Sequence, residues 1–287
     1  MYYALIVLSV LMFGGCFALQ DVYRGLRGSS LKISMESAFL GSLAGLAVLL
    51  ILNGFALEFT PFTLLMASLA ALNGIAFTFF SFRALDLINL SLFSVFSMLG
   101  GMVLPFLQGI LFYGEPLTVA KILCLICICL ALLLTVSPAN RKGGTVFYVG
   151  IFVLNGMSGV LSKLFTASPY PKTSAAGYSM WIALVTLVLS GILWLALLRK
   201  QPSDRPFSPK AGAICASQGA INRVANFLLV IALAHVDTSV QYPMVTGGVI
   251  IVSTQIALFG PRKPSRRELC SVLLAFAGML LLFVIPI

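Results

Sequence analysis

The chain has 287 residues, of which 60% are hydrophobic and only 9% charged, and its formal net charge is +10. A soluble domain needs roughly a quarter of its residues charged to keep its surface hydrated, so most of this surface must face lipid, and no segment between the apolar runs is long enough for a soluble domain. The basic residues lie in the short gaps between these runs, which is typical of membrane proteins and argues against a nucleic-acid partner.

Ten continuous apolar runs follow one another along the chain. Each has about the length that a helix needs to cross the hydrocarbon of a bilayer, roughly 20 residues. The breaks between the runs carry Pro, Gly and charged residues. We therefore predict an all-α membrane protein with about ten transmembrane helices. The predicted spans are 2–20, 33–52, 62–84, 91–113, 119–137, 145–165, 176–198, 211–234, 240–260 and 268–286.

The basic residues are distributed unevenly over the loops. Loops after odd-numbered spans, together with the span ends beside them, contain 14 Lys and Arg, and those after even-numbered spans contain 3, while Arg223 well within a span completes the total of 18. Cytoplasmic loops of membrane proteins are enriched in Lys and Arg. We therefore predict a multi-pass protein of the plasma membrane with its odd-numbered loops in the cytoplasm and both termini outside.

The two halves of the chain contain matching motifs. Gly100-Gly101 is followed by Gln108, and Gly247-Gly248 is followed by Gln255 at the same spacing. This predicts two five-helix repeats, residues 1–138 and 139–287. Because five is an odd number, the second repeat enters the membrane from the side opposite to the first. Inverted repeats of this kind allow alternating access to a central site.

The motif Gly114-Glu115-Pro116-Leu117-Thr118, with Ala84-Leu85 at the end of the third span, resembles the EamA-type branch of the drug/metabolite transporter superfamily. The resemblance covers nearly the whole chain. It implies a permease with a central cavity lined by helices 1, 3, 4, 6, 8 and 9, which commonly exports metabolites. The second half departs from the pattern, because Arg262 stands where the family has a second Glu.

The eighth predicted span carries polar residues inside its apolar run. Gln218, Asn222 and Asn226 are four residues apart and form one stripe on a helix, with Arg223 beside it. An arginine at mid-membrane costs about 2.5–3.5 kcal/mol on insertion scales, so it should face the protein interior or a water-filled cavity. We predict that these residues line the substrate pathway; the alternative is a structural network between helices.

Further candidates for the pathway come from the repeated motifs and from polar residues in other spans. Glycines allow a neighbouring helix or a ligand to approach the backbone, and each Gln supplies a donor and an acceptor two turns away. Close helix packing is the alternative for the glycines, and an amine drawn to the membrane surface is the alternative for the lysine. The candidates are Gly100, Gly101, Gln108, Gly247, Gly248, Gln255, Asn73, Asn155 and Lys163.

None of the eight acidic residues lies near the middle of a predicted span. Because a proton-driven exporter of cations needs a buried carboxylate, we expect an anionic, zwitterionic or neutral organic substrate. The expected partners are this small molecule and membrane lipid. No cofactor or metal is predicted, because Cys124, Cys127 and Cys129 lie in an apolar run without His or acid to complete a site.

Two other classes of function compete with transport. Gly156-Met157-Ser158-Gly159 has the form of a rhomboid-protease nucleophile, for which the single histidine, His235, would have to act as base. Small residues at a helix crossing explain this motif more simply, so we do not expect an enzyme. A polar stripe open to lipid would instead indicate a lipid scramblase or a channel.

Overall fold

The computed structural model describes residues 2–114, 118–135, 144–198, 206–233, 236, 238–260 and 262–284. Within these ranges the chain forms ten α-helices and no β-strand, which confirms the all-α class. The helices are α1 (Tyr2–Arg27), α2 (Leu31–Leu52), α3 (Pro61–Leu87), α4 (Leu90–Tyr113), α5 (Val119–Thr135), α6 (Thr145–Ala167), α7 (Ala175–Leu198), α8 (Pro209–Leu233), α9 (Thr238–Phe259) and α10 (Arg266–Val284).

Six helices of the described chain are long and apolar enough to cross a membrane: α1, α2, α3, α4, α6 and α7. Shorter apolar stretches occur in α5, over Ile122–Ala131, and in α9, over Met244–Phe259. Large apolar side chains are exposed on the outside of the bundle, such as Phe112 at 79% and Val146 at 67%. Exposed apolar surface on this scale is typical of a surface that faces lipid.

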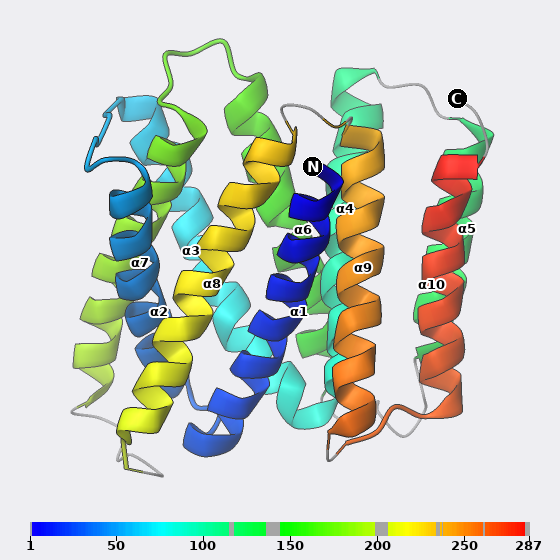
Figure 1. Ribbon diagram of the computed structural model, residues 1–287, viewed down its shortest axis with the longest axis horizontal. Helices are drawn as coiled ribbons and strands as arrows, with labels where there is room; N and C mark the ends of the chain where they lie inside the picture. The colour runs from blue at the N-terminus through cyan, green and yellow to red at the C-terminus, as the bar shows by residue number, and fades with distance from the viewer. Residues whose placement is uncertain are drawn as a thin grey trace.

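The helices form two layers. In Figure 1, α8, α1, α9 and α10 lie in front of α3, α6, α4 and α5. α1 packs on α8 and α9, and α6 packs on α3 and α4. α2 contacts α7 and α8, α4 contacts α9, and α5 contacts α10. The largest apolar core of the described residues extends over α1, α3, α4, α6, α8 and α9 and contains Phe17, Phe93 and Val249.

Local capping explains where several helices begin. Ser30, Thr60 and Asn89 each accept a hydrogen bond from the backbone N–H three residues later, at the starts of α2, α3 and α4. Ser265 and Glu268 form a reciprocal capping box at the start of α10. α1 continues about two turns beyond the predicted end, because polar groups in its last turns are paired with other helices.

The two ends of the bundle differ in the connections that they carry. The start of α1 and the end of α10 lie at the same end, at the top of Figure 1. The connections α1–α2 and α9–α10 and the start of α8 lie at the opposite end. We call the end with these connections the odd-loop end and the other the even-loop end.

Two helix crossings bring backbones from the two halves of the chain into direct contact. Gly219 of α8 lies against the backbone of Gly41 in α2, and Gly100 of α4 lies against the backbone of Phe152 in α6. A Cβ atom on Gly156 would lie 2.5 Å from the carbonyl oxygen of Gly100. No side chain fits between the helices at either crossing.

We expect Gly219→Leu to destabilise the protein by about 3 kcal/mol or more, because any side chain there overlaps the Gly41 backbone. Gly15→Leu is the matched control, since a Cβ atom on Gly15 would meet no atom within 4 Å. The yield of monodisperse protein in detergent measures the effect. Equal yields for the two variants would contradict the close α2–α8 contact.

Candidate functional site

α6 is exposed on two opposite faces. Val146, Val149 and Val153 are exposed on the outside, whereas Ser162 and Thr166 are exposed elsewhere on the helix. Ser162 follows Val153 by nine residues, which at about 100° per residue is two and a half turns. Ser162 therefore points into the bundle. An exposed polar face in that direction indicates a space that water or a polar ligand can enter.

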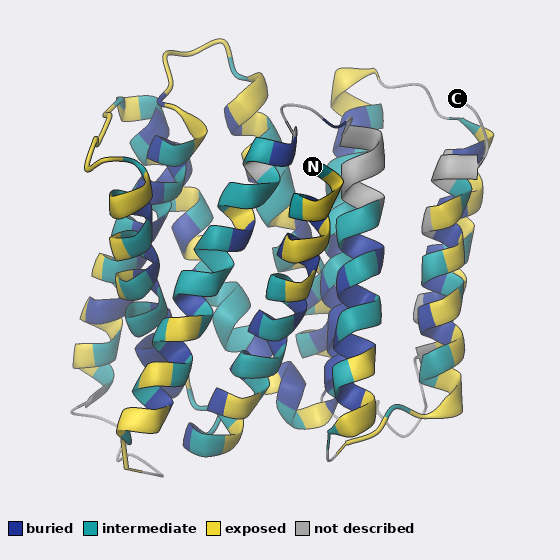
Figure 2. Cartoon of the chain, viewed as in Figure 1, coloured by how far each residue is buried: buried dark blue, intermediate teal, exposed yellow. Residues whose placement is uncertain are grey.

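α8 shows the same two-faced pattern. Ala213 and Ser217 are exposed and lie on the face of α8 that also carries Ile221, which we take as its outer face. Figure 2 shows exposed residues on the side of α8 that is turned toward the viewer. Asn226 is exposed and follows Ser217 by nine residues, so it lies on the inward face. The Nδ2 group of Asn226 donates to the carbonyl oxygen of Asn222 at 2.8 Å and to its Oδ1 at 3.3 Å. Two members of the predicted stripe are thus joined to each other.

A row of hydroxyl groups follows the inward face of α6. Ser158, Ser162 and Thr166 each donate to the carbonyl oxygen four residues earlier, at 3.3, 2.9 and 3.0 Å. Because their protons are used within the helix, their oxygen lone pairs serve as acceptors. Asn73 of α3 donates to Ser158 Oγ at 2.8 Å and fixes the row to α3. We call the following residues the inner polar face: Ser158, Ser162, Thr166, Asn222 and Asn226.

α3 contributes an open position to the same space. Gly74 follows the exposed Leu65 by nine residues and therefore lies opposite the outer face of α3. A Cβ atom on Gly74 would meet no atom within 4 Å. Because the neighbouring residue Asn73 donates to Ser158, this open position on α3 lies beside the polar face of α6.

Arg223 lies where α8 crosses α2, beside the inner polar face. A Cβ atom on Gly45 would lie 2.8 Å from Cγ of Arg223, so the aliphatic part of this side chain packs on α2. The side chain is partly buried, and among the described residues its guanidinium has no hydrogen-bond or ion-pair partner. Arg24 and Arg27, by contrast, are paired with carboxylates. An unpaired guanidinium within an apolar helix favours an anionic or hydrogen-bond-accepting ligand.

At the odd-loop end, the inward face of α1 is covered, in contrast to the exposed inward face of α6. Gln20 follows the exposed Leu11 by nine residues, yet it is only 8% exposed. Arg24 forms ion pairs with Asp21, at 2.7 Å, and with Asp86 of α3. The inward-facing position Ser162 is therefore exposed on α6, whereas the inward-facing position Gln20 is covered on α1.

The α9–α10 connection also covers this end. Nη1 of Arg262 donates to the carbonyl oxygens of Leu85 and Asp86 at 2.8 and 3.1 Å. Nδ2 of Asn89 donates to Oε2 of Glu268 at 2.9 Å. These bonds join the first half of the chain to the second, so both halves take part in the closure.

A buried ion pair near this closure is absent from the sequence predictions. Nε and Nη2 of Arg27 donate to the two carboxylate oxygens of Glu36 at 2.9 and 2.7 Å, and the Tyr23 hydroxyl donates to the same carboxylate at 2.6 Å. The side chains of Arg27 and Glu36 are only 2% and 3% exposed. The ring of Phe207 lies 5.5 Å from Cζ of Arg27. This cluster holds α1 to α2 and to the start of α8.

Contacts between the halves at the even-loop end lie to one side of the bundle. Glu58, in the α2–α3 connection, accepts a hydrogen bond from the Ser174 backbone N–H at 2.7 Å. Its carbonyl oxygen accepts another from Nε1 of Trp181 in α7, also at 2.7 Å. These bonds join the α2–α3 connection to α7 and leave the inner polar face exposed.

The glycine pairs of the repeated motif lie at helix contacts rather than beside open space. A Cβ atom on Gly101 would lie 2.7 Å from Nδ2 of Asn155, which donates to the Ser97 carbonyl oxygen at 2.6 Å. A Cβ atom on Gly248 would lie 2.7 Å from Cγ1 of Val10 in α1. These contacts favour the packing alternative for the glycines and for Asn155. The remaining glycines of the two pairs are buried: Gly100 and Gly247.

The three predicted glutamines are not brought together. Gln108 is only 6% exposed, and its Oε1 has no hydrogen-bond partner among the described residues. Gln255 is exposed, and because α4 and α9 run in opposite directions it lies near the odd-loop end, away from Gln108. Gln218 packs beside α2, where a Cβ atom on Gly41 would lie 3.6 Å from its Oε1.

Lys163 lies next to the inner polar face near the even-loop end. Its Nζ is 5.0 Å from the centre of the Tyr113 ring at the end of α4, which is a cation–π distance. The amine therefore extends toward α4.

The serine and cysteine residues considered for a protease or a metal site lie in the described part of the chain. No group of three or more His, Cys, Asp or Glu there is placed to hold a metal ion. The Ser158 hydroxyl is occupied by bonds to Leu154 and Asn73. His235 and Glu115 lie outside the described residues.

Comparisons with known proteins identify a fold but no family. No protein-family model matches the sequence. No curated protein matches it either. A solved structure described only as "Crystal structure of protein" matches with a TM-score of 0.61 at 17% sequence identity, over 96% of this chain and 95% of that chain. At this identity the likeness concerns the fold alone.

Proposed function

We propose that this chain is a membrane carrier that moves a small organic solute by alternating access. In this proposal ten helices span the membrane as two inverted repeats, residues 1–138 and 139–287, of the kind found in EamA-type permeases. The odd-loop end faces the cytoplasm of a cell whose plasma membrane holds the protein, and transport is directed outward.

The helix packing supports the inverted repeat. Adding five to each helix number turns the pairs α1–α8 and α1–α9 into α6–α3 and α6–α4, and all four pairs are in contact. The pairs α2–α7, α4–α9 and α5–α10 are converted into themselves, and each is also in contact. A two-fold relation between the halves accounts for all of these contacts.

The observation that carries the proposal is the difference between the two ends. The inward face of α6 is exposed at Ser162, whereas the inward face of α1 is covered at Gln20 and bonded over by Arg24. A carrier with one end open and the other closed has this asymmetry. A scramblase would expose its polar stripe to lipid, but here the outer faces of α6 and α8 are opposite to the polar ones.

Arg223 supports an anionic, zwitterionic or neutral substrate. Its guanidinium is a charge near the middle of α8, on the same helix as Asn222 and Asn226, and it has no partner among the described residues. A carboxylate, a phosphate or a polarised carbonyl group satisfies such a guanidinium.

We expect Arg223→Gln to lower transport of an anionic solute by about tenfold or more, because a hydrogen bond to a charged group contributes about 1.5–3 kcal/mol. Purified protein in liposomes is tested by counterflow with labelled carboxylic acids, sugar phosphates, amino acids and nucleosides. Arg266→Gln, which removes an exposed arginine at the start of α10, is the control and should transport normally.

Two results would contradict the proposal. If the wild type showed counterflow with none of the probe classes but flipped fluorescent lipid rapidly, the chain would be a scramblase. Equal transport of every anionic probe by Arg223→Gln and wild type would remove Arg223 from the pathway.

A further inference from the structure

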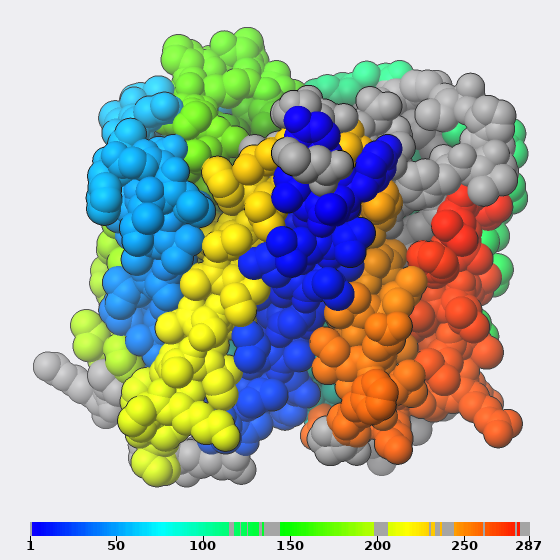
Figure 3. Space-filling view, viewed as in Figure 1, coloured from blue at the N-terminus to red at the C-terminus, as the bar shows by residue number. Residues whose placement is uncertain are grey.

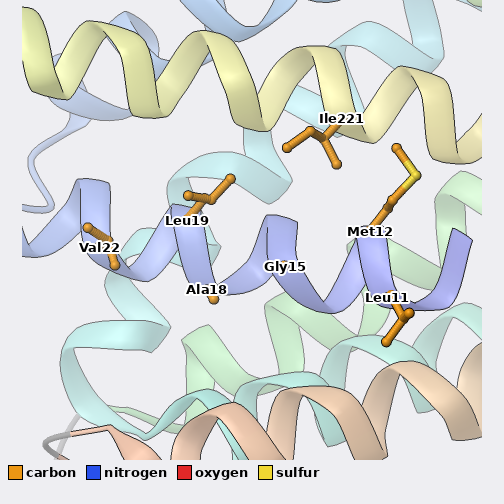
Figure 4. Close-up of a pocket in the computed structure, with 7 residues that line it drawn as sticks. All are labelled: Leu11, Met12, Gly15, Ala18, Leu19, Val22 and Ile221. Atoms are coloured by element: carbon orange, nitrogen blue, oxygen red, sulfur yellow. The ribbon is translucent and has the colours of Figure 1, made fainter. Parts of the chain in front are cut away.

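A hollow lies on the outer surface between α1 and α8. It has a volume of about 490 Å³, and Figure 4 shows its lining side chains, all of which are apolar. Leu11 and Val22 at its rim are 52% and 49% exposed. Figure 3 shows the same face of α1 uncovered between α8 and α9. The lining residues are Leu11, Met12, Gly15, Ala18, Leu19, Val22 and Ile221.

Small residues give this hollow its depth. Gly15 lies between the larger rim residues, and a Cβ atom on it would meet no atom within 4 Å. Ser217 and Ala213 are exposed on the outer face of α8, about one and two turns from Ile221. The result is an elongated groove that runs between the two helices rather than a closed cavity.

The length and direction of the groove match one leaflet of a bilayer. From Leu11 to Val22 it follows eleven residue steps of α1, which at 1.5 Å each is about 16 Å. Half of a hydrocarbon core of about 30 Å is about 15 Å. Leu11 is near the middle of α1 and Val22 is near the odd-loop end. The groove therefore extends from the middle of the membrane to the surface at that end.

An exposed cation stands where the groove meets the membrane surface. Lys210 precedes Ile221 by eleven residues, about three turns, so it lies on the same outer face of α8. It is exposed, and it forms no ion pair among the described residues. Arg24, at a similar level on α1, is already held by Asp21 and Asp86. Lys210 is thus available to a phosphate at the groove's outer end.

We propose that the α1–α8 groove binds an anionic glycerophospholipid of the odd-loop leaflet. One acyl chain occupies the groove from Leu11 to Val22, and the lipid phosphate pairs with the Lys210 ammonium. The basic loops at this end attract anionic lipid to the same leaflet. The proposal requires only that the protein lies in a bilayer and is independent of the transport proposal.

Native mass spectrometry of the full chain tests the proposal, with phosphatidylglycerol and phosphatidylcholine of identical acyl chains added in detergent. Wild-type protein should retain phosphatidylglycerol more strongly. Lys210→Gln should weaken that binding by about fivefold and leave phosphatidylcholine unchanged. Gly15→Leu, which fills the groove, should weaken both lipids. Lys263→Gln, an exposed lysine in the α9–α10 connection, is the control for charge and should bind as wild type.

Three outcomes would overturn the proposal. The first is that the wild type and Lys210→Gln each retain phosphatidylglycerol and phosphatidylcholine equally strongly. The second is unchanged lipid binding in Gly15→Leu. The third is a wild-type dimer that Gly15→Leu converts to monomer, because the groove would then be filled by a helix of a second copy. Circular dichroism of each variant confirms that it is folded before its lipid binding is compared.

Discussion

A cysteine placed at Ser162 should react with a membrane-impermeant maleimide at least about tenfold faster than one placed at Gln20. A tenfold ratio of rates corresponds to a free-energy difference of about 1.4 kcal/mol. Both positions lie nine residues after an outward-facing apolar residue, on α6 and on α1. Ser162 is exposed, whereas Gln20 is 8% exposed. The measurement is the labelling rate in a background with the six native cysteines replaced by serine.

Val153→Cys separates exposure to water from exposure to lipid. Val153 is 39% exposed but lies on the outer face of α6, so in a bilayer its thiol should stay unlabelled, because the thiolate forms only in contact with water. Labelling of Ser162→Cys from outside intact cells would agree with the positive-inside count. If Ser162→Cys were as unreactive as Val153→Cys, the inner polar face would be dry and the carrier proposal would fail.

Replacing Glu36 by Gln should destabilise the protein by about 3–5 kcal/mol, because it removes the carboxylate of a buried ion pair with Arg27. The Tyr23 hydroxyl also loses a charged acceptor. The free energy of unfolding is measured by detergent titration in mixed micelles. Glu58→Gln, which changes an exposed carboxylate, is the control and should shift stability by less than about 1 kcal/mol.

The double variant Arg27→Met/Glu36→Leu distinguishes a lost charge pair from lost packing. It removes both charges and keeps apolar volume, so most of the stability should return. If the double variant were as unstable as Glu36→Gln, packing around these side chains rather than the broken ion pair would cause the loss.

Much of the fold was predictable from the length of the apolar runs. A chain in lipid has to satisfy its backbone hydrogen bonds internally, so an apolar run of about 20 residues indicates a helix. Each predicted span overlaps a described helix, and six of these helices are long and apolar enough to cross a membrane. The stripe of Asn222 and Asn226 was visible as a four-residue spacing, and the row of Ser158, Ser162 and Thr166 has the same signal in the sequence.

Other parts of the site depend on tertiary contacts that local patterns do not encode. Glu36 and Arg27 sit near the ends of predicted spans, where charged residues usually face water, and only the fold buries them against each other. The repeated Gly-Gly motif indicates close approach but not what approaches, which for Gly100 is the Phe152 backbone. Gln108 and Gln255 match in sequence, but the antiparallel course of α4 and α9 separates them.

In the proposed carrier, the glycine contacts of α8 with α2 and of α6 with α4 would hold these two helix pairs together as rigid bodies. Each contact joins a helix of one sequence half to a helix of the other, at Gly41–Gly219 and at Gly100–Phe152. Backbone against backbone has no rotamers to readjust, so each pair has to travel as a single block. Exchange of the open and closed ends would then displace an α2–α8 block relative to an α4–α6 block, with α1 sliding where it lies between α8 and α9. The domains of motion would cut across the sequence repeat rather than follow it.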